Sequence, residues 1–133
     1  MNAPSAPHAL LPQINQRNVP PELLAALKAQ FGTRCSTALA VREQHGRDES
    51  VFDVPPPAAV VFAESTVDVA AAVGLAAQYR VPVIPFGVGS SLEGHLLAVQ
   101  GGISIDLGRM NKVLSINPED LTVTVQALSL IHI

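Results

Sequence analysis

The sequence contains one cysteine, no tryptophan and one tyrosine, and only 14% of its residues are charged. Its single cysteine, Cys35, excludes an internal disulfide and a metal site built from several thiolates, and we expect it to be a buried, inert thiol. The net charge of −3 provides no basic surface for nucleic acid, and the lack of tryptophan removes a common base-stacking side chain. These absences argue against a nucleic-acid partner and against a metal site.

Long hydrophobic runs are also missing, because no segment approaches the ~20 consecutive apolar residues that a membrane-spanning helix requires. The first eighteen residues lack the basic start and apolar block of a signal peptide, and they are not arginine-rich like a transit peptide. We therefore expect a cytoplasmic protein. With 133 residues and 48% hydrophobic content, the chain has the length of one domain, and we expect further chain or a partner to cover part of its apolar surface.

The most unusual backbone chemistry lies in the glycine-rich loop that follows a short apolar run. Proline has no N–H, so Pro85 is predicted to end the strand before the loop. Gly87 and Gly89 can adopt positive φ, which lets successive backbone amides turn inward and form an anion site. Ser90 and Ser91 add hydroxyl donors at the end of this site. The loop therefore predicts a site for phosphate or pyrophosphate.

Two common nucleotide-binding loops do not fit this stretch. A P-loop requires a lysine, which is missing here. The dinucleotide fingerprint G-x-G-x-x-G also fails, because the third glycine after Gly87 and Gly89 is Gly94, and the stretch that follows is a poor helix. An ordinary glycine-rich connection remains the plain alternative to an anion site.

The hydrophobic pattern predicts an α+β fold that starts with a βαβ unit and continues into a mixed sheet. Ser65 is expected to cap a helix with Asp68 as the acidic half of a capping box. The pattern at 36–41 fits a strand or a short helix equally. The sequence predicts helices at 21–31 and 66–79, strands at 58–62, 82–85 and 102–107, and a hairpin of 112–116 with 121–126 that makes the sheet mixed.

The polar composition of segment 42–50 predicts an exposed loop. His45, Arg47 and Asp48 could hold a ligand there, and a solvated loop of mixed charge is the alternative. The chain divides into a disordered lead (1–20), a helix and loop (21–54), the glycine-loop domain (55–127) and a tail (128–133) whose native origin the sequence leaves open. Because the chain stops soon after an alternating strand, we expect a truncated domain.

Several motifs together carry a family resemblance. They are Ala-Val-Val-Phe (59–62), Val-Pro-Val-Ile-Pro (81–85), the loop Gly-x-Gly-Ser-Ser-Leu-Glu-Gly (87–94) and Gly-Gly-Ile-Ser-Ile-Asp-Leu (101–107). With them, 56–126 resembles the N-terminal part of the FAD-binding domain of FAD-linked oxidases related to vanillyl-alcohol oxidase and p-cresol methylhydroxylase. Segments 42–50 and 86–95 are most similar to D-lactate dehydrogenases that use cytochrome or quinone acceptors, and to the glycolate oxidase flavin subunit.

This resemblance implies an incomplete FAD-binding domain of the p-cresol methylhydroxylase type, in which the loop binds the FAD pyrophosphate. In some relatives a histidine attaches FAD covalently, and its place falls near Ser90, so the resemblance implies non-covalent FAD here and a loop-anchoring role for His95. The family's catalytic residues have no counterpart in this chain. The implied cofactor-binding residues are Pro85, Phe86, Gly87, Val88, Gly89, Ser90, Ser91 and Gly94.

The resemblance further implies a parent enzyme that takes a hydride from a 2-hydroxy acid such as D-lactate and passes electrons to a cytochrome or quinone, with peripheral membrane association. Two other hypotheses stay open at this point. One is a small α/β interaction module without catalysis. The other is an NAD-binding domain with Asp106 as the ribose-binding acid, which would require a helix at 90–100.

Because the family's catalytic residues have no counterpart here, we expect the 133-residue chain to show no turnover of its own. The test is lactate-dependent dye reduction by the purified chain in the presence of FAD. Detectable reduction above a lactate-free control would contradict this expectation.

Overall fold

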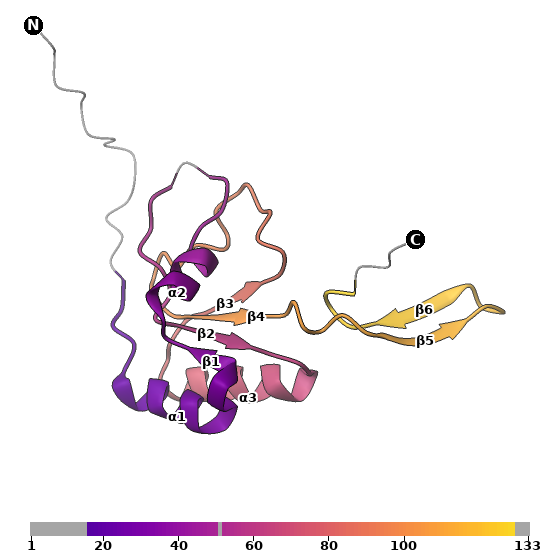
Figure 1. Ribbon diagram of the computed structural model, residues 1–133, viewed down its shortest axis with the longest axis horizontal. Coiled ribbons are helices and arrows are strands. Elements are labelled where there is room, and N and C mark those ends of the chain that lie inside the picture. The colour runs from indigo at the N-terminus through magenta and orange to yellow at the C-terminus, as the bar shows by residue number, and fades with distance from the viewer. Residues whose placement is uncertain (1–15, 51, 130–133) are drawn as a thin grey trace, which may run out of the picture.

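The computed structural model describes residues 16–50 and 52–129, in which a four-stranded mixed sheet carries helices on both faces (Figure 1). The strand order is β1-β2-β4-β3, and β5 and β6 form a separate two-stranded sheet. The predicted α+β class is therefore confirmed. The elements in chain order are α1 (Pro21–Phe31), a short 3-10 helix (Gly32–Arg34), β1 (Cys35–Ser36), α2 (Leu39–His45), β2 (Ala59–Phe62), α3 (Thr66–Gln78), β3 (Val83–Phe86), β4 (Ile103–Asp106), β5 (Val113–Asn117) and β6 (Thr122–Val125).

The predicted first helix is confirmed as α1, which has proline at its first position and glycine after its last. Its buried residues Leu23, Leu27 and Phe31 are spaced at helical intervals along one face. They pack against Ala72 and Ala76 of α3 and against alternate residues of β2 and β4. Helices α1 and α3 thus lie on the same face of the sheet, below it in Figure 1.

The predicted βαβ unit is present as β2, α3 and β3, but β4 lies between its two strands. Both β2 and β3 pair with β4 in parallel. As expected, Ser65 caps α3: its hydroxyl accepts the Asp68 N–H at 3.2 Å. The Asp68 carboxylate in turn accepts the Glu64 N–H, and it pairs with Arg34 at 2.6 Å. Chiefly because of the Arg34 hydrogen bond, the pKa of Asp68 is lowered from its ordinary value.

The expectation that Pro85 ends its strand is wrong, because β3 continues to Phe86. In the described sheet β3 is an edge strand. The carbonyls of Pro82 and Phe86 accept N–H groups at β4, so by alternation Pro85 presents its backbone nitrogen to the open side of the strand. A proline at that position costs the sheet no hydrogen bond, which is why the edge tolerates it.

Segment 42–50 is also different from its prediction as an exposed loop. Residues 42–45 complete α2, and the ambiguous stretch before them divides into β1 and the start of this helix. The solvated-loop interpretation fails for His45, which is only 3% exposed. Gly46, next in the chain, approaches Pro56 so closely that an added Cβ would lie 2.8 Å from the proline Cα. Only residues 45 and 46 of this segment are buried, whereas 43, 44, 47 and 49 are exposed, as expected of a solvated stretch.

The predicted hairpin is confirmed as β5 and β6, but it is not what makes the main sheet mixed. Strand β1 does so, because it pairs antiparallel with β2. The hairpin extends away from the body of the molecule (Figure 1). An irregularity between Val113 and Ser115 places Val113 and Ile116 on the same face, and every residue of both strands is exposed. That apolar face consists of Val113, Ile116, Val123 and Val125.

The lead and the tail are described only in part. Residues 1–15 and 130–133 lie outside the described residues, as does residue 51. Gln16 donates from its side-chain amide to the carbonyls of Pro55 (2.8 Å) and Ala98 (2.7 Å). Within the described ranges, no helix combines the length and the apolar character needed to cross a membrane.

Leu27 generates a test of this packing, because its side chain is fully buried between α3 and the sheet. We expect Leu27→Ala to lower the free energy of unfolding by about 2–5 kcal/mol through lost burial and a residual cavity. Lys28→Ala, on the exposed side of the same helix, should change it by less than about 0.5 kcal/mol. Urea unfolding followed by circular dichroism measures both. Equal effects of the two variants would contradict the packing of α1.

Candidate functional site

The glycine loop leaves the carboxyl end of β3 beside the end of β4. Ligands of open α/β sheets bind at such ends. The expectation of positive φ is confirmed at Gly89 (φ 74°) but wrong at Gly87. A Cβ at Gly87 would instead lie 3.3 Å from a side-chain carbon of Leu128, so that position favours a small residue because of close packing. Gly94 also has positive φ, at 79°.

The backbone amides of this loop are largely unused. In the described part of the chain, the N–H groups of residues 87–93 have no hydrogen-bond acceptor, whereas the N–H of Leu97 donates to Gly94. Phe86 differs from the residues after it, because its carbonyl accepts from Leu107 and its backbone belongs to the β3–β4 ladder. The predicted anion site of backbone amides can therefore begin only at Gly87. Unpaired donors that are concentrated in one loop are what a bound anion needs.

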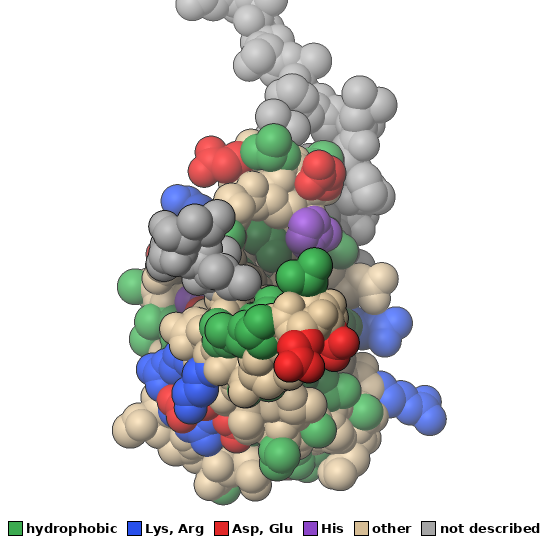
Figure 2. Space-filling view, turned by 90° about the vertical axis from the view of Figure 1, so that its right-hand side faces the viewer, with side chains coloured by type: hydrophobic (Ala, Val, Ile, Leu, Met, Phe, Trp, Pro, Cys, Tyr) green, Lys and Arg blue, Asp and Glu red, His purple; other side chains and the backbone are tan. Residues whose placement is uncertain are grey.

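Residues of this loop line a shallow pocket of about 280 Å³. Of the eight predicted residues, the structure brings five together here, at 87–91, while Pro85 and Phe86 lie in β3 and Gly94 lies outside the lining. Figure 2 looks onto this end of the molecule, where acidic and hydrophobic side chains gather near a histidine at the surface. The sequence interpretation left Glu93 and Leu96 out of the site, although both line the pocket together with His95.

The polar side chains of the loop bond to one another. The Ser91 hydroxyl lies 2.9 Å from His95 Nδ1, and it donates to a Glu93 carboxylate oxygen at 3.3 Å. These contacts connect the middle of the loop to its end and agree with an anchoring function of His95. The residues that line the pocket include no lysine and no arginine. Any anion held here depends mainly on backbone dipoles.

The underside of the loop rests on an aromatic ring. Phe86 is only 8% exposed, and a Cβ added at Gly89 would lie 2.8 Å from its ring carbon Cζ. The same ring also contacts the imidazole of His45, with ring centroids 4.3 Å apart and the planes tilted by 45°. His45 Nε2 is 2.8 Å from an Asp106 carboxylate oxygen, whose partner oxygen accepts the Gly108 N–H at 2.7 Å.

The sequence predicts a ligand site or a solvated loop at His45, and it gives Asp106 a function only under the NAD hypothesis. The missed signal is the alternation of β4. Ile103 and Ile105 face the core formed with α1 and α3, so Asp106 faces the opposite side, where α2 lies. A carboxylate that faces a helix carrying a histidine is a natural partner for that ring.

Asp48 lies in the segment after α2, between the helix and the glycine loop. Its carboxylate accepts the N–H and the hydroxyl of Ser50, at 3.0 and 2.5 Å. The pKa of Asp48 is lowered, first by the Ser50 hydroxyl, although burial opposes the shift. The backbone N–H of Ser50, that of Gly94 and the charge of His95 lower it further. Gly94, one of the predicted residues, thus lies close to this carboxylate and outside the pocket lining.

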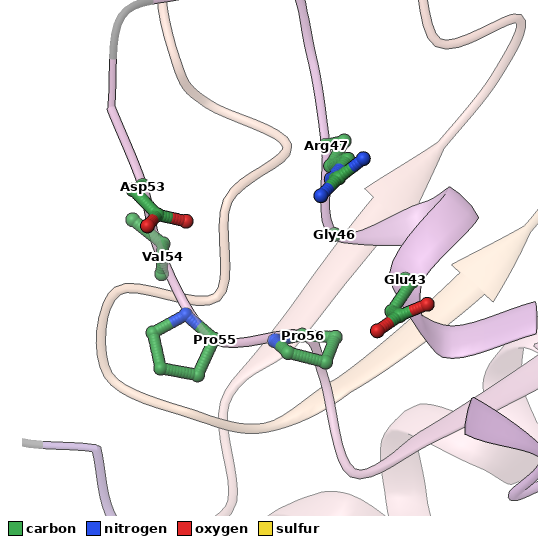
Figure 3. A pocket seen from close by; sticks show the side chains of 7 residues that line it. All are labelled: Glu43, Gly46, Arg47, Asp53, Val54, Pro55 and Pro56. Atoms are coloured by element: carbon green, nitrogen blue, oxygen red, sulfur yellow. The ribbon is translucent and has the colours of Figure 1, made fainter. Parts of the chain in front are cut away.

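A second pocket, of about 300 Å³, lies between the end of α2 and the proline segment before β2 (Figure 3). In Figure 3, Glu43 and Arg47 come from the helix side, and Asp53 comes from the opposite segment. Arg47 therefore lies in a different pocket from the glycine loop, and the three residues 45, 47 and 48 do not form one ligand site. In the described part of the chain, no group of three or more His, Cys, Asp and Glu side chains could hold a metal ion.

The geometry also bears on the NAD hypothesis. Residues 90–100 form bends and turns in place of the helix that this hypothesis requires. Asp106 is occupied by His45 and by the Gly108 N–H, so its carboxylate is not available to a ribose. Both observations disfavour a dinucleotide fold of the usual type.

Comparisons with known proteins agree on a family. A family model described as "FAD binding domain" matches residues 57–128. The chain is 48% identical over 91 residues to the probable mitochondrial D-lactate dehydrogenase of Danio rerio, covering 68% of this chain and 18% of that protein. It is 35% identical over 112 residues to the mitochondrial D-lactate dehydrogenase (cytochrome) of Arabidopsis thaliana, covering 83% and 20%. The chain thus spans about a fifth of the length of these curated relatives.

Solved structures share this fold. A structure of alkyldihydroxyacetonephosphate synthase matches with a TM-score of 0.73 and 30% identity, over 84% of this chain and 25% of that one. A structure of p-cresol methylhydroxylase with substrate bound matches with a TM-score of 0.59 and 22% identity, over 74% and 20%, which shows the fold alone. The resemblance inferred from the sequence motifs is confirmed by these matches.

Amide hydrogen exchange tests whether the loop donors are unused. We expect the N–H groups of residues 87–93 to exchange at least about a hundredfold faster than that of Ile105 in β4, because they lack acceptors in the described structure. Leu97, whose N–H donates to Gly94 within the same loop, is the matched control and should exchange more slowly. Strong protection of 87–93 in the chain alone would contradict the open cradle.

Proposed function

The chain belongs to the FAD binding domain family, and from this premise we propose that its glycine loop holds the pyrophosphate of FAD without a covalent bond. The observation that carries the proposal is the set of amides at 87–93 that lack an acceptor in the described structure, at the carboxyl end of β3. A pyrophosphate presents several oxygen acceptors and negative charge, which suits several converging donors.

The residues of the loop fit this group. Gly89 adopts a backbone conformation that favours glycine, and its lack of a side chain lets the loop lie against the Phe86 ring. Because positions 87 and 89 are glycine, neither residue places a side chain of its own beside its amide. Ser90 can add a hydroxyl donor, whereas the hydroxyl of Ser91 already donates to Glu93. The loop would thus bind and orient the phosphates and hold the middle of the cofactor at the carboxyl end of β3.

Non-covalent binding is supported by the side chains of the pocket lining. Ser90 has no ring nitrogen, and the Nδ1 atom of His95, the only histidine in this lining, already contacts the Ser91 hydroxyl. The pocket lining contains neither cysteine nor tyrosine. Release of the flavin into the supernatant on acid precipitation is the direct check of non-covalent binding.

For the whole protein we propose a flavin-dependent dehydrogenase of D-lactate or a similar 2-hydroxy acid. When bound, FAD would supply the acceptor for a hydride from the substrate's α-carbon. The names of the zebrafish and Arabidopsis relatives support this substrate class, and the Arabidopsis name supports a cytochrome acceptor. A quinone acceptor, peripheral membrane association and a cytoplasmic location stay predictions. This chain contributes the phosphate cradle, and no residue of it is assigned a catalytic role.

A second candidate is an interaction module, and one observation favours it. The hairpin presents Val113, Ile116, Val123 and Val125 on one exposed face, which a partner protein could cover. The two candidates differ in their response to flavin, because binding through the hairpin requires no cofactor. A flavin titration therefore separates them.

The test is titration of the chain with FAD, followed by flavin fluorescence. We expect saturable binding by the wild type and at least about tenfold weaker binding by Gly89→Ala, because an added Cβ would meet the Phe86 ring at a strained φ. Gly74→Ala is the matched control: Gly74 lies in α3 with nothing within 4 Å of an added Cβ.

The control should leave FAD affinity unchanged and raise the free energy of unfolding by about 0.5–1 kcal/mol, because alanine is the better helix former. Unchanged flavin emission with the wild-type chain would contradict the proposed function and favour the interaction module. Equal affinities of wild type and Gly89→Ala would remove the glycine loop from the binding site.

A further inference from the structure

His45 is a buried titratable residue that the proposed pyrophosphate site does not use. It is the last residue of α2 and only 3% exposed. Its Nδ1 lies 2.8 Å from the Val41 carbonyl oxygen, and its Nε2 lies 2.8 Å from a carboxylate oxygen of Asp106. Neutral imidazole has one donor and one acceptor nitrogen, but both nitrogens here face oxygen atoms. The number of protons that His45 and Asp106 hold together therefore follows from the positions of these atoms.

A carbonyl oxygen can only accept, so Nδ1 must carry a hydrogen. The contact between Nε2 and Asp106 then needs a second hydrogen, either on the ring or on the carboxyl group. In both arrangements His45 and Asp106 together hold one proton more than a neutral ring and an ionised carboxylate. Burial lowers the pKa of His45, but the hydrogen bond to Asp106, the Val41 carbonyl and the charge of Asp106 together raise it above its ordinary value.

This unit lies directly below the glycine loop. The ring of His45 contacts the ring of Phe86 at a centroid distance of 4.3 Å, and Phe62 lies at 5.6 Å with its ring nearly perpendicular. Gly89 lies against the same Phe86 ring, where an added Cβ would come within 2.8 Å of Cζ. His45, Phe86 and Gly89 thus form a continuous series of contacts from α2 to the loop.

The other charged groups of the packed elements have partners of their own. From the β2 side, the Arg109 guanidinium lies over the Phe62 ring and pairs with Glu64 at 2.7 Å. On α2 itself, Arg42 donates to the Pro57 carbonyl. After α2, Asp48 is bonded to Ser50. Among these groups, only Asp106 contributes through its charge to the pKa of His45.

We propose that His45 is a positioning residue for the cofactor loop, and that the proton it shares with Asp106 is required for tight FAD binding at residues 87–91. This inference rests on the proposed function. When the proton leaves, a ring lone pair faces either the Val41 carbonyl or the Asp106 carboxylate, and one of the two hydrogen bonds is lost. The Phe86 ring then loses its support, and the loop amides lose their alignment.

The sign of the pH dependence follows from the direction of the shift. A histidine whose pKa is raised in the folded state contributes stability that is fully present below its ordinary pKa of about 6.5. That contribution is lost as the pH rises through the raised value. FAD affinity should follow the same course, so the dissociation constant should rise with pH by up to about tenfold per pH unit.

The decisive variant is Asp106→Asn, measured with the wild-type chain by FAD titration from pH about 6 to about 9. The new amide can donate to an unprotonated Nε2, and its oxygen can still accept the Gly108 N–H, so the network no longer needs the additional proton. We expect the wild-type affinity to fall with rising pH, and the variant's affinity to be independent of pH. His95→Gln tests the other histidine of the site: its FAD affinity can differ from wild type, because His95 contacts Ser91, but its affinity should still fall with rising pH.

Nitrogen-15 NMR of the His45 ring and carbon-13 NMR of the Asp106 carboxyl give a readout that does not depend on FAD. We expect two protonated ring nitrogens, or a protonated carboxyl group, in the wild-type chain at pH about 7. A neutral ring beside an ionised carboxylate would overturn the inference, even where Asp106→Asn fails to fold.

The titrations separate two kinds of failure. A wild-type chain that binds FAD with no pH dependence would overturn this inference alone. A wild-type chain that binds no FAD at any pH would overturn the proposed function and this inference with it. A pH dependence that persists in Asp106→Asn and disappears in His95→Gln would assign the proton to the loop histidine and overturn the function of His45.

Discussion

The ends of three parallel strands lie in register, and the rest of the site depends on this alignment. Phe62 closes β2, Asp106 closes β4 and Phe86 closes β3, and each lies opposite its neighbour across the sheet. Because side chains alternate along a strand, all three point to the face on which α2 lies. A shift of one residue in any strand would turn its end residue toward α1 and α3. The strand register thus determines which side chains contact the imidazole of His45.

This alignment also explains why a polar group lies among aromatic rings. A buried carboxylate is costly unless hydrogen bonds satisfy it, and here the ring nitrogen and a backbone N–H do so. Asp106 lies where β4 ends and the chain turns. One of its oxygens can therefore accept the Gly108 N–H, while the other contacts His45 at the end of α2. The polar contact therefore specifies how α2 sits on the sheet, and the aromatic rings exclude water around it.

Local signals allowed much of the fold to be predicted from sequence. Proline at the start and glycine at the end mark α1, Ser65 marks α3, and alternation marks β4 and the hairpin. The glycine spacing located the loop and excluded two common nucleotide sites. The insertion of β4 between β2 and β3 could not be read from the sequence, because strand order depends on contacts between distant segments.

The prediction of an exposed loop at 42–50 is wrong for the end of α2 and for the burial of residues 45 and 46, for the same reason. A run of polar residues is typical of a solvated loop, and only the distant partner Asp106 makes a buried His45 favourable. Pro85 was misread because the sequence does not tell whether a strand lies at an edge or in the centre of a sheet. Five loop residues were identified correctly as neighbours, since they are adjacent in the chain, while the supporting residues come from other elements.

The proline in β3 has a consequence for how copies of this molecule behave toward one another. An exposed strand edge offers a row of donors and acceptors to which a second chain can add, and this is a common route to self-association. Pro85 removes a donor from the middle of that row, and its ring occupies the approach. Pro85 therefore disfavours the addition of a second strand beside β3. The unpaired amides of the glycine loop stay accessible to a small anion, and the edge of the sheet does not become a template for aggregation.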